Sequence, residues 1–336
     1  MDTLPSSASI GVLGAGAWGT ALAQSLACAG RAVLLQAREG EVAQSIALKR
    51  ENAAFLPGVP LSPALEVTTD PEACAIRDLL LVVTPAQHVR GALENIRTSV
   101  QRGTPVILCA KGIEIHSGRL LSTIAQEILP QAKIGLLSGP TFAREIALGL
   151  PGAATLALPD PHDARGLAQV LGNKTFRLYP SDDVIGVETG GAVKNVIAIA
   201  AGIVAGRGLG DTARAAIVTR GLAEIARLAV ALGGRRETVM GLSGMGDLIL
   251  TSTSLQSRNY SLGFALGQGR PLADILAERR AVTEGLHTAR AVQALATAKD
   301  VDMPVCRVMH ACLCEGLSVD EGIDSLLSRP VPFETL

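Results

Sequence analysis

Short apolar runs alternate with helical patterns through the first half of the chain, and this alternation limits the possible folds more than any other feature. SIGVLGAG is followed by AVLLQAR, LLLVVT, PVILCAKG and KIGLLSGP, and the later runs are AATLAL and TFRLYP. Stretches such as TALAQSLACAG and PAQHVRGALENIRTSV lie between them and have helical spacing. Strands that alternate with helices are expected to lie parallel in one sheet, and nearly continuous hydrophobicity indicates that both faces are covered. The first half is therefore predicted to be a doubly wound α/β domain.

The pattern changes near residues 181–187. Beyond this point, long helical segments such as DTARAAIVTRGLAEIARLAVALG replace the strands. A chain of 336 residues is long enough for two cores, since single cores seldom exceed about 250 to 300 residues. We therefore predict an α/β domain over residues 1–184, followed by an all-α domain over residues 185–336.

The stretch VETGGAVKNVIAIAAGIVAG, residues 187–206, is long and apolar enough to cross a bilayer. It also contains Glu188, Lys194 and paired glycines, and charged residues are costly inside a membrane. We favour a buried helix of the second domain over a membrane span.

The charge balance argues against two classes of partner. Thirty Lys and Arg against 31 Asp and Glu give a formal net charge of −1, which supplies no general field for nucleic acid or an anionic membrane. The six cysteines form no C-x-x-C pair and have no histidines at zinc-ligand spacing, which favours a reducing compartment and no metal site. The N-terminal residues do not resemble a secretory signal, so we expect a cytoplasmic protein.

Gly14, Gly16 and Gly19 form G-x-G-x-x-G between the first predicted strand and the first predicted helix. The first glycine permits the turn, the second lets backbone N–H groups approach a pyrophosphate, and the third lets the helix pack on the strand. In this setting the motif predicts a dinucleotide site and a Rossmann-like domain. Trp18, the only tryptophan, lies inside the loop, where its ring would either anchor the core or flank the cofactor.

The end of the second predicted strand indicates which dinucleotide is bound. Arg38 stands where an acid that binds the ribose is usual, and its guanidinium can pair with a 2′-phosphate but cannot accept a hydrogen bond from a ribose hydroxyl. Glu39 follows immediately and could serve NAD(H) instead. NADP(H) is therefore favoured, and NAD(H) stays open as the alternative.

Two lysines and one acid are candidates for chemistry. Lys111 in CAKGIE follows a predicted strand, and open α/β sheets bind ligands at the carboxyl ends of their strands, although a loop lysine could simply be solvated. Lys194 has small and apolar neighbours one helical turn away, so another part of the protein or a ligand could approach its side chain. Alternatively, the side chain of Lys194 could extend to solvent. Asp247 in GLSGMGDLILT lies among glycines and aliphatic residues and could instead cap the following helix.

Two other segments offer polar groups for a substrate. Ser257, Arg258 and Asn259 are adjacent in QSRNYS, where the donors suit a phosphate, although an ordinary polar turn would look the same. Thr141 in SGPTFA follows a predicted strand as Lys111 does, and Gly139 could act only in the turn.

In this order, the segments resemble those of the bacterial-type NAD(P)-dependent glycerol-3-phosphate dehydrogenases. The matching segments are GVLGAGAWGTALA, CAKGIE, LSGPTFAREIALGLP, GGAVKNVIAIAAGI, TRGLAEIARL, GLSGMGDLILT, QSRN and VTEG, from about Ile10 to Leu317. The resemblance implies the reversible reduction of dihydroxyacetone phosphate to sn-glycerol 3-phosphate, which supplies glycerol 3-phosphate for phospholipid synthesis. It also implies an N-terminal dinucleotide domain and an all-helical C-terminal domain. The expected partner is this small substrate, with a homodimer as an option and no nucleic acid.

The resemblance also implies roles for individual residues. Lys194 would exchange the proton, and Lys111, Asp247 and Thr251 would complete the catalytic group. The implied cofactor contacts are Gly14, Gly16, Ala17, Trp18, Gly19, Arg38, Lys111, Ala143, Arg258, Val282 and Glu284. The implied substrate contacts are Lys111, Gly139, Thr141, Lys194, Asn195, Asp247, Ser257, Arg258 and Asn259. In the reduction, Lys194 would protonate the developing alkoxide while Lys111 adds positive potential near the carbonyl oxygen.

Two other functions fit parts of the sequence. A reductase of similar build, acting on a β-hydroxyacid, ketopantoate or 6-phosphogluconate, is the nearer alternative, but the paired QSRN and GMGD segments argue against it. A non-catalytic module that senses NADP(H) would leave the lysines with structural roles.

Overall fold

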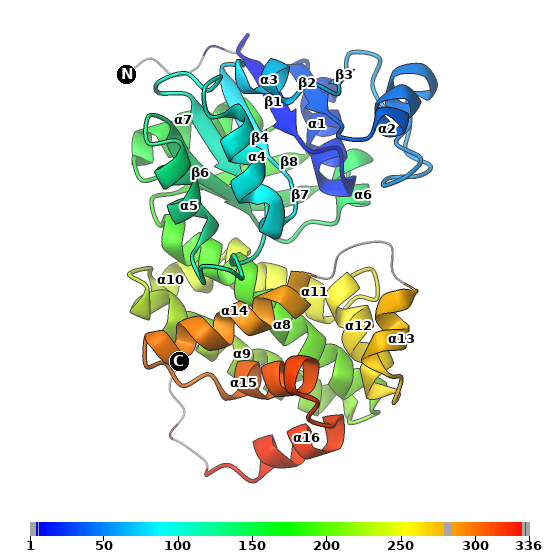
Figure 1. Ribbon diagram of the computed structural model, residues 1–336, viewed down its shortest axis with the longest axis vertical. Coiled ribbons are helices and arrows are strands. Elements are labelled where there is room, and N and C mark those ends of the chain that lie inside the picture. The colour runs from blue at the N-terminus through cyan, green and yellow to red at the C-terminus, as the bar shows by residue number, and fades with distance from the viewer. Residues whose placement is uncertain (1–4, 6, 279–283, 331–332, 334–336) are drawn as a thin grey trace. The chain divides into compact units, whose positions relative to one another are not determined.

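The computed structural model describes Pro5, residues 7–278, residues 284–330 and Phe333. The chain divides into two compact units (Figure 1). Unit 1 comprises Met1–Ala110 and Leu121–Val184, and unit 2 comprises Lys111–Leu120 and Ile185–Leu336. The sequence predicted a continuous first domain over residues 1–184, but the segment Lys111–Leu120 belongs to unit 2.

Unit 1 is built on one mixed sheet. Its strands are β1 (Ser9–Leu13), β2 (Ala32–Gln36), β3 (Glu66–Thr68), β4 (Leu79–Val82), β5 (Pro105–Leu108), β6 (Lys133–Ser138), β7 (Gly152–Ala157) and β8 (Phe176–Ser181). They lie in the order β3-β2-β1-β4-β5-β6-β7-β8. All neighbours pair in parallel except β6 and β7.

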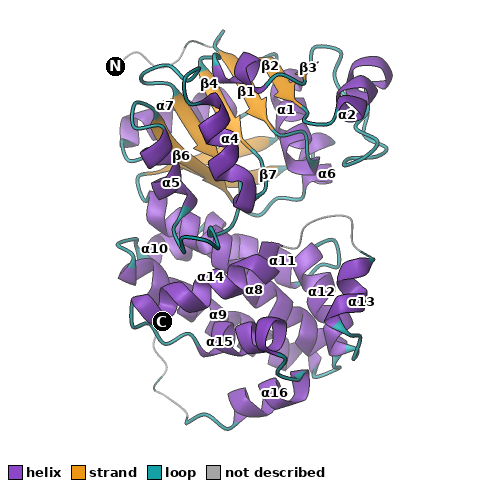
Figure 2. Ribbon diagram, viewed as in Figure 1, coloured by secondary structure: helices purple, strands orange, loops and turns teal. Residues whose placement is uncertain are grey.

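Helices cover both faces of this sheet (Figure 2). The helices of unit 1 are α1 (Ala17–Cys28), α2 (Gly40–Gln44), α3 (Pro71–Ala75), α4 (Val89–Ile96), α5 (Leu121–Ile128), α6 (Ala143–Ala147) and α7 (Pro161–Leu171). The helices α3, α4 and α5 cover one face, and α1, α6 and α7 pack on the other (Figures 1 and 2). The predicted doubly wound α/β fold is confirmed.

Two features of the sheet differ from the sequence prediction. The run Glu66–Val67–Thr68 forms β3, which was not predicted because three residues at a sheet edge are too few to show a strand pattern. The run AATLAL, in β7, was predicted to lie parallel to its neighbours but is antiparallel to β6. The connection, residues 139–151, contains the short helix α6 of five residues, which spans about 7.5 Å, in place of a helix as long as the six-residue strand β6 of about 20 Å.

Unit 2 contains helices and no strand among its described residues. Its helices are α8 (Val184–Gly206), α9 (Gly210–Ala231), α10 (Arg236–Val239), α11 (Asp247–Ser252), α12 (Arg258–Gly267), α13 (Leu272–Ala277), α14 (Glu284–Ala298), α15 (Pro304–His310) and α16 (Val319–Leu327). The predicted helical second domain is therefore confirmed.

The helix α8 passes through the core of unit 2 and is buried along nearly its whole length. It crosses α12 at glycines, since a Cβ atom on Gly202 would lie 2.2 Å from the carbonyl oxygen of Tyr260, and one on Gly263 would lie 1.9 Å from that of Ile199. By length and composition α8 could cross a membrane, but most of its apolar stretch is buried within the protein. The small residues in this stretch therefore serve close helix packing.

The segment Lys111–Leu120 belongs to unit 2 because of its apolar side chains. Ile113 pairs with Leu120 in an isolated antiparallel bridge, and the backbone N–H of Glu114 donates to the carbonyl oxygen of Arg119 at 3.1 Å. Ile113 and Leu120 are buried in the apolar core of unit 2. Burial of these two side chains holds the segment that carries Lys111 in unit 2.

Candidate active site

The glycine loop of unit 1 has a physical reason for each glycine. Gly14 has φ +112°, a conformation that side chains rarely adopt, and a Cβ atom on Gly19 would lie 1.9 Å from the carbonyl oxygen of Gly14. A Cβ atom on Gly16 would meet no atom within 4 Å. The turn and the close helix packing are therefore present, and the open side at Gly16 fits a pyrophosphate at the N-terminus of α1.

Trp18 follows Ala17, the first residue of α1. Its ring meets Phe176 edge to face, with the ring centroids 6.3 Å apart. This contact favours the interpretation of Trp18 as a core anchor, and its contact with a cofactor stays a prediction.

Sequence reasoning missed Asn52, which supports the glycine loop. Its side chain is fully buried, and its Nδ2 donates to the carbonyl oxygen of Ala15 and to Oγ1 of Thr20, both at 2.8 Å. Asn52 lies in a Pro-rich stretch without periodicity, so no sequence signal pointed to it.

Arg38 and Glu39 form an ion pair after β2. Nε and Nη2 of Arg38 donate to Oε1 of Glu39 at 3.0 and 2.6 Å, and the Arg38 side chain is 82% exposed. The two candidates for reading the adenosine ribose are thus bonded to each other, and a 2′-phosphate on Arg38 would compete with Glu39.

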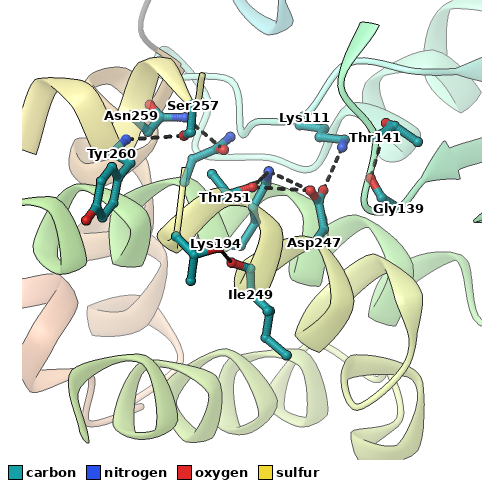
Figure 3. A network of polar contacts seen from close by, with 12 residues as sticks. Lys111, Gly139, Thr141, Lys194, Asp247, Ile249, Thr251, Ser257, Asn259 and Tyr260 are labelled. Carbon is teal, nitrogen blue, oxygen red and sulfur yellow. Dashed lines mark hydrogen bonds and ion pairs between the residues drawn. The ribbon is translucent and has the colours of Figure 1, made fainter. Parts of the chain in front are cut away.

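Two lysines share one carboxylate in unit 2 (Figure 3). Nζ of Lys194 donates to Oδ1 of Asp247 at 2.9 Å, and Nζ of Lys111 donates to Oδ2 of the same residue at 2.6 Å. Nζ of Lys194 also donates to Oγ1 of Thr251 at 2.6 Å. The structure therefore brings all four predicted catalytic residues together in one cluster.

Glycines let Asp247 reach the lysine. A turn of π-helix at Leu242–Gly246 precedes α11, which starts at Asp247. A Cβ atom on Gly190, one helical turn before Lys194, would lie 3.1 Å from Cα of Gly244. Side chains at these glycines would push α11 away from α8. Asp247 does begin a helix, as its alternative interpretation required, but its carboxylate is bonded to the lysines.

Burial and charge oppose each other in this cluster. Burial lowers the pKa of Lys194 to about 8, and the neighbouring Lys111 lowers it as well, while Asp247 raises it. For Asp247, burial by itself raises the pKa, but the ammonium groups of Lys111 and Lys194 bring it below its ordinary value. The cluster therefore contains an ionised carboxylate and a lysine that can gain or lose a proton near neutral pH.

The two predicted asparagines are bonded to each other. Nδ2 of Asn259 donates to Oδ1 of Asn195 at 2.9 Å, and Oδ1 of Asn259 accepts from the backbone N–H of Gly285 at 3.0 Å. Asn195 follows Lys194 directly, and Gly285 follows Glu284, the first residue of α14. These bonds join α8, α12 and the start of α14.

The remaining predicted residues lie at the starts of helices or in the loop after β6, apart from one outside the described residues. The hydroxyl of Ser257 caps α12 by accepting from the backbone N–H of Tyr260, and Arg258 is the exposed first residue of that helix. In unit 1, Oγ1 of Thr141 donates to the carbonyl oxygen of Gly139 at 3.3 Å, and Ala143 begins α6. Val282 lies outside the described residues.

The side chains of the described residues offer no metal centre. Nowhere among them do three or more His, Cys, Asp or Glu side chains come together to hold an ion, and all six cysteines are free.

Two models of protein families match the chain. Residues 9–164 match the N-terminus of NAD-dependent glycerol-3-phosphate dehydrogenase, and residues 183–324 match its C-terminus. The chain belongs to the NAD-dependent glycerol-3-phosphate dehydrogenase family. The resemblance drawn from the sequence motifs is confirmed.

Individual glycerol-3-phosphate dehydrogenases are similar to this chain over nearly its whole length. A glycerol-3-phosphate dehydrogenase, NAD(P)+, of Rhodospirillum rubrum is 56% identical over 326 residues, which cover 97% of this chain and 93% of the relative. One of Parvibaculum lavamentivorans is 51% identical over 97% of this chain and 98% of the relative. The crystal structure of glycerol-3-phosphate dehydrogenase from Coxiella burnetii is 36% identical, with a TM-score of 0.92 over 97% of this chain and 100% of that one.

The alternative of a ketopantoate-type reductase is more distant. A ketopantoate reductase structure from Ralstonia eutropha is 16% identical and has a TM-score of 0.59 over 95% of this chain and 99% of that one. That likeness shows a shared fold alone.

Proposed function

We propose that this chain catalyses the reversible reduction of dihydroxyacetone phosphate to sn-glycerol 3-phosphate, with NADPH favoured over NADH as the hydride donor. Family membership and the NAD(P)+-dependent relatives support the reaction and the type of cofactor. The observation that carries the mechanism is the buried cluster of Lys194, Lys111, Asp247 and Thr251.

Lys194 is the proton donor in this proposal. Its Nζ carries a proton that can pass to the oxygen of the carbonyl group as the ketone carbon receives the hydride. In the opposite direction, neutral Lys194 takes the proton from the hydroxyl group. Asp247 and Thr251 hold Nζ by hydrogen bonds of 2.9 and 2.6 Å, so its position is fixed before substrate binds.

Lys111 supplies electrostatic stabilisation. With both lysines protonated and Asp247 ionised, the cluster has two positive charges and one negative charge. The excess positive charge favours an oxygen that becomes negative during the reduction, and burial strengthens the effect because little water screens it. Asp247 lowers the cost of placing two ammonium groups side by side.

The binding roles follow from the polar ends of the helices. The glycine loop and the N-terminus of α1 would hold the pyrophosphate, and Arg38 would pair with a 2′-phosphate. When bound, the cofactor supplies the hydride. The guanidinium of Arg258, an exposed residue at the start of α12, would hold the substrate phosphate, with Asn259 beside it.

The test is the oxidation of NADPH and of NADH, followed separately, with dihydroxyacetone phosphate, with ketopantoate and without a ketone. We expect oxidation that depends on dihydroxyacetone phosphate and is faster at low cofactor concentration with NADPH. Turnover with ketopantoate but not with dihydroxyacetone phosphate would favour the alternative reductase. Tight cofactor binding without any turnover would favour the sensing module.

The cellular setting is a further part of the proposal. We place the enzyme in the cytoplasm, as a homodimer that supplies glycerol 3-phosphate for phospholipid synthesis. The free cysteines support a reducing compartment. Sedimentation equilibrium of the purified chain tests the dimer, and a mass near the 34.6 kDa of one chain would contradict it.

A further inference from the structure

Thr84 carries a buried hydroxyl group that the proposed mechanism leaves unused. Its Oγ1 is out of reach of solvent and has no hydrogen-bond partner within the part of the chain that the structure describes. Buried polar groups without a partner are rare in folded proteins because they lose their bonds to water and gain none in return. Such a group in a binding domain points to a partner that arrives with the ligand.

The position of Thr84 in the sheet indicates which ligand this is. Thr84 comes two residues after β4, the strand that lies beside β1. The pairing of β1 and β4 continues past β4, since the backbone N–H of Val83 donates to the carbonyl oxygen of Leu13 at 2.9 Å. The helices that follow β1 and β4 lie on opposite faces of the sheet, so this is the switch point at which open α/β sheets bind ligands.

The backbone of Thr84 also borders the glycine loop. A Cβ atom on Gly14 would lie 3.2 Å from the backbone nitrogen of Thr84, so the two segments touch. On the same loop, Nε1 of Trp18 is likewise buried and has no partner among the described residues. Two unpaired polar groups therefore flank the loop that is shaped for a pyrophosphate.

We propose that the hydroxyl of Thr84 forms a hydrogen bond to the bound dinucleotide, at an oxygen of the pyrophosphate or of the adjoining ribose. This inference rests on the proposed function, because it requires that the chain bind NADP(H) or NAD(H). Both dinucleotides have these oxygens, so Thr84 contributes to the affinity for each and does not discriminate between them.

Thr20 provides the matched comparison. It is also a buried threonine beside the glycine loop, but its hydroxyl is already paired. Oγ1 of Thr20 donates to the carbonyl oxygen of Ala15 at 3.4 Å and accepts from Nδ2 of Asn52 at 2.8 Å. The substitutions Thr84→Val and Thr20→Val both replace a buried hydroxyl by a methyl group of similar size. Only Thr20→Val removes hydrogen bonds that exist among the described residues, so only Thr20→Val should destabilise the protein.

The experiment measures two quantities on the full chain: the melting temperature without cofactor, and the Kd of NADPH and of NADH by titration calorimetry. For Thr84→Val we expect an unchanged or higher melting temperature and a raised Kd for both cofactors. The Kd should rise about two- to tenfold if the acceptor is a neutral ribose oxygen, and more than about tenfold if it is a charged pyrophosphate oxygen. Thr84→Ser, which keeps the hydroxyl, should bind both cofactors as the unmodified chain does. Thr20→Val should lower the melting temperature.

Two results would overturn the inference. One is a Thr84→Val variant that binds both cofactors with unchanged Kd. The other is a Thr84→Val variant that loses as much thermal stability as Thr20→Val, since its hydroxyl would then be paired within the fold. If the unmodified chain binds neither NADPH nor NADH, the proposed function fails first, and this inference fails with it.

Discussion

Lys194 and Asp247 are 53 residues apart in the chain, yet Nζ of the lysine lies 2.9 Å from Oδ1 of the carboxylate. Their side chains are only 6% and 2% exposed. A charge buried this deeply is costly unless it is paired, so the two residues depend on each other. The second bond of the carboxylate, to Lys111, extends this dependence to the segment between β5 and α5.

Asp247→Asn should destabilise the protein, because it leaves the buried ammonium group of Lys194 and the partly buried one of Lys111 without a counter-charge. We expect a loss of about 3 to 5 kcal/mol in the free energy of unfolding, measured by urea denaturation. Asp163→Asn is the control, since Asp163 pairs with Lys133 at a similar 2.6 Å but the two side chains are 22% and 32% exposed. That variant should lose no more than about 1 kcal/mol. Equal losses for the two variants would contradict the buried pairing.

The lowered pKa of Lys194 predicts opposite pH dependence for the two directions of the reaction. Reduction requires the ammonium form, so its kcat/KM should be constant well below pH 8 and fall roughly tenfold per pH unit above the pKa of about 8. Oxidation requires the neutral form, so its kcat/KM should rise with pH and level off above that pKa. A reductive kcat/KM that stays constant up to about pH 9.5 would be incompatible with Lys194 as the acid.

Gly16 and Gly19 should respond differently to alanine. A Cβ atom on Gly16 meets open space, so Gly16→Ala should have the melting temperature of the unmodified chain. Its affinity for both cofactors should fall at least about tenfold, since the methyl group would keep the pyrophosphate from the backbone. A Cβ atom on Gly19 would lie 1.9 Å from the carbonyl oxygen of Gly14, so Gly19→Ala should lower stability by about 1 to 3 kcal/mol. Calorimetry and thermal melting separate the two effects. Normal cofactor binding by Gly16→Ala would refute the assignment of the loop.

Arg38→Ala should weaken the binding of NADPH by about 1.5 to 3 kcal/mol, the range for a hydrogen bond to a charged group. The binding of NADH should stay nearly unchanged. The substitution also releases Glu39, whose Oε1 accepts two bonds from Arg38, and free Glu39 can bind a ribose hydroxyl of NADH. Arg102→Ala, at another exposed position of unit 1, controls for the general loss of positive charge. Equal weakening of both cofactors by Arg38→Ala would exclude a contact with the 2′-phosphate.

The sequence predicted the fold where local patterns are strong. Runs such as LLLVVT and PVILCAKG became central strands because continuous apolar residues are buried on both sides of a covered sheet. Prediction failed where the outcome depended on geometry across the fold. The three residues of β3 are too short for a pattern, and the direction of β7 depends on how the connection from β6 folds.

In the site too, local features could be predicted from the sequence and contacts between distant residues could not. The glycine motif is local, and its turn and close packing could be inferred from three positions. The bonds of Asp247 to Lys194 and Lys111 join residues 53 and 136 positions apart, and spacing along the chain carries no information about such distances. The resemblance to a family grouped these residues, and the structure supplied the geometry. Asn52 was missed because it supports the glycine loop through tertiary contacts, and Thr84 was missed because only the folded structure shows that its hydroxyl is buried without a partner among the described residues.

The role of Lys194 is tested most directly by kcat in both directions for Lys194→Met, with the melting temperature and NADPH affinity measured on the same sample. Methionine keeps most of the volume of the lysine stem and removes the proton and the charge, so the variant should fold and bind NADPH. Lys133→Met, which removes a lysine of unit 1 whose side chain is 32% exposed, should keep its turnover. We predict that kcat of Lys194→Met falls by at least about 10² to 10⁴ in both directions. Turnover close to that of the unmodified chain, in a folded variant that binds NADPH, would contradict the catalytic role of Lys194.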